Sequence, residues 1–158
     1  MLARRPEPTA LVVDLGRSEA LVHPTDAKPA LLVGGRLHRL PPSVLGVPTD
    51  VDQLDGLLTA PAYAAAAGER DRPAPALDHD VAIGEYVDDR FGPEVTDRLL
   101  EPLLGGVYAG RARELSFAAV APGLFARAAA GGSLEQHARA AASDGGSGPA
   151  TWKRDTSK

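Results

Sequence analysis

The chain has 158 residues, of which 44% are hydrophobic and 24% charged, an ordinary composition for one globular domain or for a piece of a larger one. Its net charge of −4 argues against a general nucleic-acid-binding protein, and the absence of cysteine excludes disulfide scaffolds, cysteine nucleophiles and thiolate metal sites. The sequence shows no targeting or membrane-spanning run, so we expect a cytoplasmic protein with at most weak peripheral membrane contact.

The first predicted elements are a short helix and a β-hairpin. Pro6 suits the first turn of a helix, because its missing N–H would be unpaired there, and Gly16 is placed to end that helix. Two apolar arms flank Gly34-Gly35, and a two-residue hairpin turn requires positive φ angles. We therefore predict one hairpin at about residues 30–40.

Short helices are predicted for most of residues 50–142. The spacing of apolar residues predicts a helix over 50–58, and an alanine-rich run predicts another over 61–70. Asp80 is the predicted N-cap of a third helix, which Gly92-Pro93 closes.

The remaining helices are interrupted by proline and glycine. Pro102 should kink or shorten the helix after Pro93, and a further helix is predicted from 113 to 121. The spacing of Ser133 and Gln136 resembles a capping box and predicts the start of a last helix. Residues 143–158 have no apolar period and are predicted to be disordered. The expected fold is mainly α with one hairpin.

No established catalytic or metal-binding motif is present. The four histidines have no ligand spacing, and we expect them to face solvent or lie in loops: His23, His38, His79 and His137. The triplet Asp78-His79-Asp80 is better explained as a loop that leads into a helix cap. There is no nucleophile elbow, no phosphate-binding loop and no Gly-x-Gly-x-x-Gly fingerprint.

Two local features allow alternative interpretations. The run from Gly105 to Gly110 is either a helix C-cap with a tight turn, which spacing alone favours, or a loop whose backbone approaches a flat ligand. Arg4 and Arg5 are either a solvated basic segment or a source of one guanidinium that binds a carboxylate.

A longer pattern is more specific. Residues 80–110, DVAIGEYVDDRFGPEVTDRLLEPLLGGVYAG, resemble the FAD-dependent porphyrinogen oxidases of haem synthesis. The agreement continues through Arg113-Glu114-Leu115-Ser116 and Gly131-Gly132-Ser133-Leu134, and it covers about residues 1–140. The high arginine, alanine and glycine content resembles the actinobacterial members.

The resemblance implies a reaction and a binding site. Members of this family oxidise coproporphyrinogen III or protoporphyrinogen IX with oxygen, and their FAD carries out the hydride chemistry. By resemblance, Arg5 pairs with a substrate propionate, and four residues line the substrate cavity: Gly106, Val107, Tyr108 and Ala109. The resemblance implies no catalytic side chain and no metal.

The resemblance also implies that residues 1–142 correspond to part of the α+β substrate-binding and helical region of a two-domain flavin oxidase. Family members begin with a dinucleotide-binding unit that this sequence does not show. We therefore expect that the chain alone binds no FAD and is inactive unless a separate flavin-domain chain completes it. The alternatives are a non-catalytic tetrapyrrole-binding or partner-docking module and an aggregation-prone pseudogene product.

Overall fold

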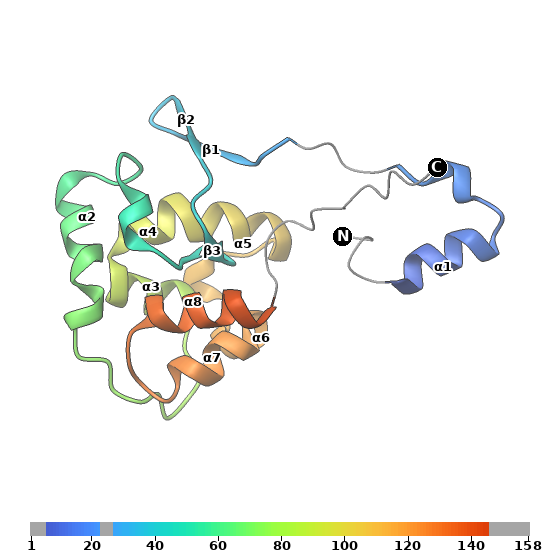
Figure 1. The fold of residues 1–158 in the computed structure, drawn as a ribbon. Helices are drawn as coiled ribbons and strands as arrows, with labels where there is room; N and C mark the ends of the chain where they lie inside the picture. Colours follow the sequence, from blue (N-terminus) through green and yellow to red (C-terminus); the bar gives the residue numbers. More distant parts are fainter. Residues whose placement is uncertain (1–5, 23–26, 146–158) are drawn as a thin grey trace. The chain divides into compact units, whose positions relative to one another are not determined.

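The computed structural model describes residues 6–22 and 27–145, and the chain divides into two compact units. The smaller unit contains helix α1 (Pro6–Asp14) and the 3₁₀ turn η2 (Ser18–Ala20) (Figure 1). As predicted, Pro6 opens α1, and Gly16 follows it with a φ of 64°. None of the residues of α1 is buried. All other elements belong to the larger unit, Pro29–Gly146.

The larger unit begins with two hairpins, where the sequence predicted one. The predicted hairpin pairs β1 (Ala30–Val33) with β2 (Arg36–Arg39), and its turn glycines have φ angles of 56° and 75°. The second pairs β3 (Ser43–Val44) with β4 (Val47–Pro48). Its arms are only two residues long, too short to show an alternating pattern.

The turn of the second hairpin lies directly against a helix. A Cβ atom on Gly46 would be 2.6 Å from the Cα of Leu100, so no other residue fits there without movement. Gly46 has a φ of 98°, and Leu45 before it also has a positive φ of 54°. The hairpin is thus fixed by close backbone packing rather than by strand length.

Residues 50–71 form one α-helix with a 3₁₀ turn on each side. These elements are η3 (Val51–Leu54), α2 (Ala60–Ala67) and η4 (Gly68–Asp71). The predicted helix over 50–58 is therefore wrong beyond one turn, because Asp55 leaves the helical region and Gly56 has a φ of 73°. The helix predicted over 61–70 corresponds to α2 and η4.

Two helical segments cross the middle of the larger unit. The first is α3 (Ile83–Phe91), which ends at Gly92. The second combines α4 (Pro93–Val95), the π-helical turn η5 (Thr96–Leu100) and α5 (Glu101–Tyr108). In the π turn the Glu101 N–H donates to the Thr96 carbonyl. The wide turn admits Pro102 at the start of α5, so the helix continues where a kink or shortening was predicted.

The last part of the unit is a group of short helices around α8. It contains η6 (Ala112–Glu114), α6 (Phe117–Val120), α7 (Pro122–Ala128) and α8 (Leu134–Gly145). The helix predicted over 113–121 is confirmed only where α6 lies, because an extended residue before it, Ser116, pairs with Ala82 in a β-bridge. Ser133 caps α8 as predicted, and its Oγ accepts the Gln136 N–H at 3.3 Å.

The predicted disordered segment begins too early. Residues 143–145 are the last residues of α8, and the Ser143 hydroxyl donates to the Arg139 carbonyl at 3.1 Å. The remainder of that prediction, 146–158, lies outside the described residues.

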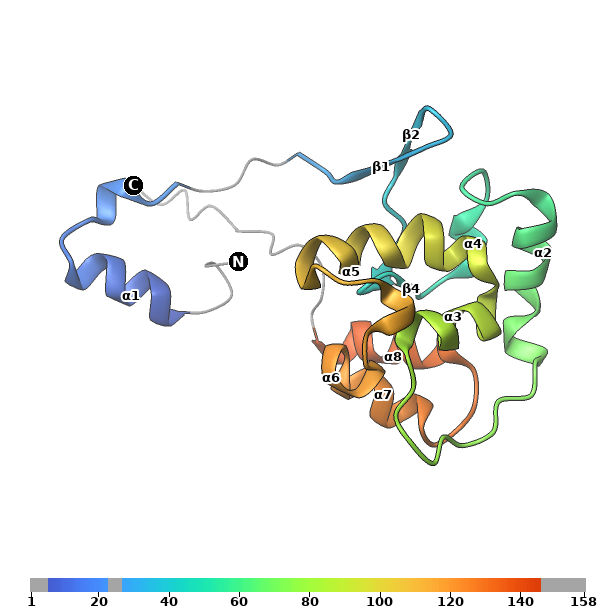
Figure 2. The same ribbon diagram turned by 180° about the vertical axis from the view of Figure 1, so that it is seen from behind.

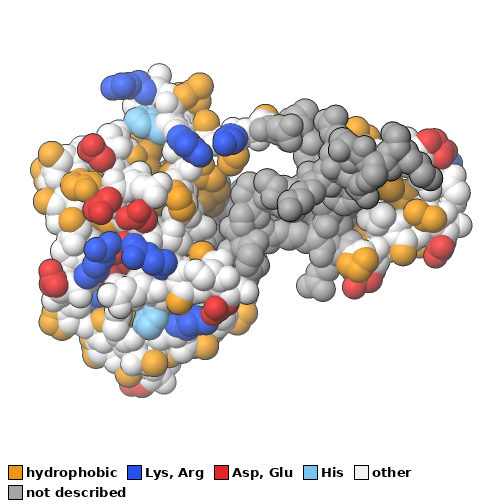
Figure 3. Space-filling view, viewed as in Figure 1, with side chains coloured by type: hydrophobic (Ala, Val, Ile, Leu, Met, Phe, Trp, Pro, Cys, Tyr) orange, Lys and Arg blue, Asp and Glu red, His pale blue; other side chains and the backbone are white. Residues whose placement is uncertain are grey.

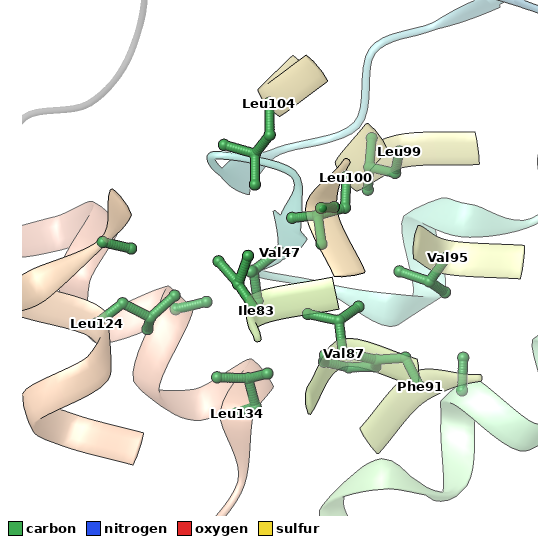
Figure 4. Packing of buried hydrophobic residues seen from close by; sticks show 14 of the residues in the cluster. Val47, Ile83, Val87, Phe91, Val95, Leu99, Leu100, Leu104, Leu124 and Leu134 are labelled. Atoms are coloured by element: carbon green, nitrogen blue, oxygen red, sulfur yellow. The ribbon is translucent and has the colours of Figure 1, made fainter. Parts of the chain in front are cut away.

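The core lies where α3, the η5–α5 segment, α7 and α8 meet. Figure 4 shows buried side chains from these elements pointing toward one another. They include Ile83, Val87, Leu100, Leu104, Leu124 and Leu134, all at most 3% exposed. The fold is therefore mainly helical with two small antiparallel sheets, as predicted apart from the second hairpin.

The surface in Figure 3 shows basic and acidic side chains beside one another rather than a uniform basic stripe. Within the described residues, no helix combines the length and the apolarity that a membrane crossing requires.

Candidate functional site at the end of helix α5

The predicted substrate-lining residues come together at the C-terminus of α5. Gly106, Val107 and Tyr108 form its last turn, and Ala109 caps it in the left-handed conformation with a φ of 50°. The Ala109 N–H donates to the Gly105 carbonyl at 3.0 Å. The run from Gly105 is therefore mostly helical, and the C-cap interpretation describes its backbone. We call residues 106–110 the α5 turn.

The α5 turn presents apolar side chains to solvent. Val107 is 72% exposed and Tyr108 is 43% exposed, and the two are adjacent in the chain. Tyr108 remains tied to the protein, since its hydroxyl lies 3.4 Å from the Val120 carbonyl oxygen. An exposed apolar surface at a backbone turn could pack against a flat apolar ligand.

The segment after the α5 turn is fixed to α3, and Figure 2 shows the chain turning back from α5 toward that helix. Gly84 permits this approach, because a Cβ there would be 2.5 Å from the Arg113 backbone nitrogen. The Ile83 N–H also donates to the Leu115 carbonyl at 2.9 Å.

Arg113 adds an ionic link between helices. Its guanidinium donates to Asp88 of α3 at 2.6 and 3.0 Å and to Asp97 of η5 at 2.7 Å. The hydrogen bonds to Asp88 and then Asp97 raise the pKa of Arg113 above its ordinary value. The Gly84 and Arg113 positions in the family-like pattern therefore act together in supporting the α5 turn.

Asp80 does not cap α3 as predicted. The N-cap of α3 is Ala82, and the Asp80 carboxylate instead binds the start of α6, whose N-cap is Ser116. Its Oδ1 accepts the Ala118 N–H at 2.9 Å, and its Oδ2 accepts the Ser116 hydroxyl at 2.5 Å. These two hydrogen bonds, Ser116 first, lower the pKa of Asp80. The position of this carboxylate near the start of α3 suggested a local cap, but Asp80 binds residues 116 and 118 instead.

Two of the histidines that the structure describes lie within hydrogen-bonding distance of a group close to them in the sequence. His79 contacts the Asp78 carboxylate, and Nε2 of His137 lies 2.8 Å from the Gly131 carbonyl oxygen. Across residues 6–22 and 27–145, no three His, Asp or Glu side chains come together in a metal-binding arrangement. His23 lies outside the described residues.

The most buried charges were not predicted from the sequence. The Glu69 carboxylate accepts bonds from Arg90 at 2.7 and 2.9 Å, from the Ser133 hydroxyl at 2.6 Å and from the Leu134 N–H at 2.7 Å. Neither Glu69 nor Arg90 is more than 1% exposed. They are 21 residues apart, so no local spacing reveals the pair. The one available signal was the predicted Ser133 cap.

A second buried carboxylate, Glu135, joins α8 to η3 and η4. Arg70 donates to both of its oxygens, at 2.5 and 2.6 Å, and the Val51 N–H donates at 3.2 Å. Burial disfavours ionisation of Glu135, but these bonds outweigh it and hold the pKa of the carboxyl below its ordinary value. Both carboxylates serve the packing of the unit and lie outside the α5 turn.

The other predicted site residue, Arg5, lies outside the described residues. Two surface hollows, of about 270 and 550 Å³, are lined by other residues than those of the α5 turn. The described residues also do not fit FAD. Their sheets are two-stranded antiparallel hairpins, whereas a dinucleotide pyrophosphate is held by a glycine-rich turn between a parallel strand and a helix.

Comparisons with known proteins show similarity over most of the chain. The chain is 42% identical over 127 residues to the coproporphyrinogen III oxidase of Mycobacterium leprae, covering 79% of this chain and 28% of that protein. It is 38% identical over 149 residues to the enzyme of the same name from Mycobacterium bovis, covering 92% and 33%. No family model matches the sequence.

A solved structure shows the same fold. The crystal structure of a protein named as a protoporphyrinogen oxidase, from Exiguobacterium sp. 255-15, superposes with a TM-score of 0.69 at 33% identity. The match covers 85% of this chain and 31% of that one.

The relatives named here share one class, the oxidases that act on porphyrinogens. The chain belongs to the porphyrinogen oxidase family, and it spans about a third of the length of the curated relatives it matches.

Proposed function

We propose that this chain supplies the substrate-facing helical region of an oxygen-dependent coproporphyrinogen III oxidase. The observation that carries the proposal is the α5 turn, an exposed apolar turn followed by a segment that packs closely against α3. Coproporphyrinogen III is preferred over protoporphyrinogen IX because the two mycobacterial relatives described above carry the former name.

In this proposal the α5 turn packs against one face of the tetrapyrrole. Val107 and Tyr108 provide apolar surface, and the backbone of Gly106 and Ala109 can approach the macrocycle closely because neither residue has a long side chain. Arg5 would pair with a propionate. The oxidation itself requires an electron acceptor, which FAD supplies in the family when it is bound.

We propose that FAD is held by residues other than the described ones, for example by those of a separate flavin-domain chain. The two-domain flavin oxidase arrangement and a cytoplasmic location are parts of the same proposal. Without such a partner the chain is proposed to bind tetrapyrrole and not to convert it. The alternative proposal is a non-catalytic tetrapyrrole-binding or partner-docking module.

A binding titration with coproporphyrin III tests the proposal. We expect saturable binding, seen as a shift of the porphyrin absorption band, and Val107→Asp should weaken it at least about tenfold because a carboxylate repels the carboxylated porphyrin and disrupts apolar contact. Leu37→Asp is the matched control, since Leu37 is 77% exposed but lies on β2.

Two results would contradict the proposal. One is the absence of saturable binding. The other is equal weakening by both variants, which would indicate adsorption to any exposed apolar side chain. In a parallel assay, porphyrin formation above the spontaneous rate by the chain with added FAD would contradict the proposed need for a flavin-binding partner.

A further inference from the structure

Glu101 forms a hydrogen bond that connects the two sides of the α5 turn. It is the first residue of α5, two helical turns before the cap at Ala109, and its side chain is half-buried. Its Oε2 accepts the Ala112 N–H at 2.7 Å, a length typical of a charge-assisted hydrogen bond. The Glu101 side chain therefore links the start of α5 to Ala112, the first residue of η6, on the other side of the α5 turn.

The residues around Glu101 leave space for this reach. A Cβ on Gly105 would lie 3.7 Å from the Glu101 Oε1, so the carboxylate runs alongside Gly105 without obstruction. Ala112 is fully buried, and its N–H donates to this carboxylate. Loss of the carboxylate would leave a buried donor unpaired, which is costly in a folded protein.

The backbone of the α5 turn adopts a conformation that the surrounding structure must hold in place. Ala109 has a φ of 50°, a conformation that residues with a Cβ adopt only when their surroundings hold them there. Gly84 fixes the far side of the segment through backbone packing, and Glu101 is the side chain that fixes the near side.

We propose that Glu101 is a positioning residue, which holds the α5 turn in the conformation that binds tetrapyrrole without touching the ligand itself. This inference rests on the proposed function. It predicts that the backbone geometry of the α5 turn, and through it the affinity for a porphyrin, depends on a carboxylate or another acceptor at position 101.

The test compares Glu101→Ala and Glu101→Gln with a control, Glu114→Ala. The Glu114 side chain lies in the same region, is 69% exposed and forms an ion pair with Arg111 at 4.0 Å. Coproporphyrin III affinity is measured by fluorescence. We expect Glu101→Ala to raise Kd about tenfold and Glu101→Gln, whose amide oxygen can still accept the Ala112 N–H, to stay within about threefold of the unmodified chain.

Amide hydrogen exchange provides a readout that does not need the ligand. Exchange at residues 109–112 should speed up in Glu101→Ala, and it should be slow in Glu101→Gln and in the control. Unchanged exchange or unchanged Kd in Glu101→Ala, or a Glu101→Gln variant as weak as Glu101→Ala, would overturn the inference. If the unmodified chain binds no porphyrin, the proposed function fails instead, and the exchange rates still decide whether Glu101 holds the turn.

Discussion

At the scale of single residues, the buried charges contribute most to the specificity of the fold. Glu69 and Arg90 join η4 to α3, and Ser133 and the Leu134 N–H bring the start of α8 to the same carboxylate. Every contact replaces a bond to water that burial removed. Such a cluster stabilises one arrangement of three helices, because any other arrangement leaves a charge unpaired.

Removal of one partner of this pair should be severe. Glu69→Ala leaves the Arg90 guanidinium buried without its carboxylate, and we expect the free energy of unfolding to fall by about 3–5 kcal/mol in urea titrations. The control is Arg127→Ala, which breaks an ion pair whose Asp144 side chain is 66% exposed and should change stability by less than about 1 kcal/mol. Equal effects would contradict this assignment.

Glu135 gives the protein a specific acid sensitivity. Its pKa in the folded state lies below that of the unfolded chain, so its contribution to stability is complete above the ordinary value of about 4.3 and is lost as pH falls through the lower folded value. The difference in unfolding free energy between the unmodified chain and Glu135→Gln should therefore shrink between pH 7 and about pH 3.5. A difference that stays constant over this pH range would contradict the role assigned to Glu135.

At the scale of elements, glycines decide which segments can approach one another. Gly84→Ala places a methyl group 2.6 Å from the Ala112 carbonyl carbon and should destabilise the protein by about 1–3 kcal/mol, because a backbone segment must shift. Gly123→Ala is the matched control in a helix with open space around it, and it should be neutral or stabilising by up to about 1 kcal/mol. Thermal or urea unfolding of both variants checks the contrast.

The elements also show how far the sequence could predict the structure. Local signals succeeded where the partner is local: Gly34-Gly35 for the hairpin, Gly92-Pro93 for the helix boundary, and Ser133 for the cap of α8. They failed where a distant contact decides the conformation. Asp80 had a plausible nearby helix, but its partners are at positions 116 and 118.

The candidate site shows the same difference between features that are local in the sequence and features that depend on distant contacts. The resemblance selected four of the five residues of the α5 turn, 106–109, and in the structure these four lie at the C-terminal end of α5. The sequence could not show that three of them are helical, because glycine usually indicates a loop. It also could not show the support from Glu101 and Gly84, since both act through backbone atoms of a segment about 11 to 29 residues away.

At the scale of the whole molecule, the two units should differ in local stability. The nine-residue helix α1 buries no residue, and an isolated helix of this length is marginal in water, whereas α3 contributes several fully buried side chains. Amides of α1 should exchange within seconds at neutral pH, and those of α3 should be among the slowest in the chain. Similar protection of both helices would show that α1 has a stabilising contact that its burial does not reveal.

The π turn at η5 has a consequence for how this region can evolve. A π turn carries one more residue than the α-helical path, and each residue of an α-helix advances the chain by about 100° around its axis. The wide turn absorbs the extra residue, so deletion of a single residue between 96 and 100 would regularise the helix and leave Val107 and Tyr108 on nearly the same side. A deletion within the regular turns of α5 would instead rotate both side chains by about 100°, so the π turn is the part of this segment that should best accept the loss of one residue.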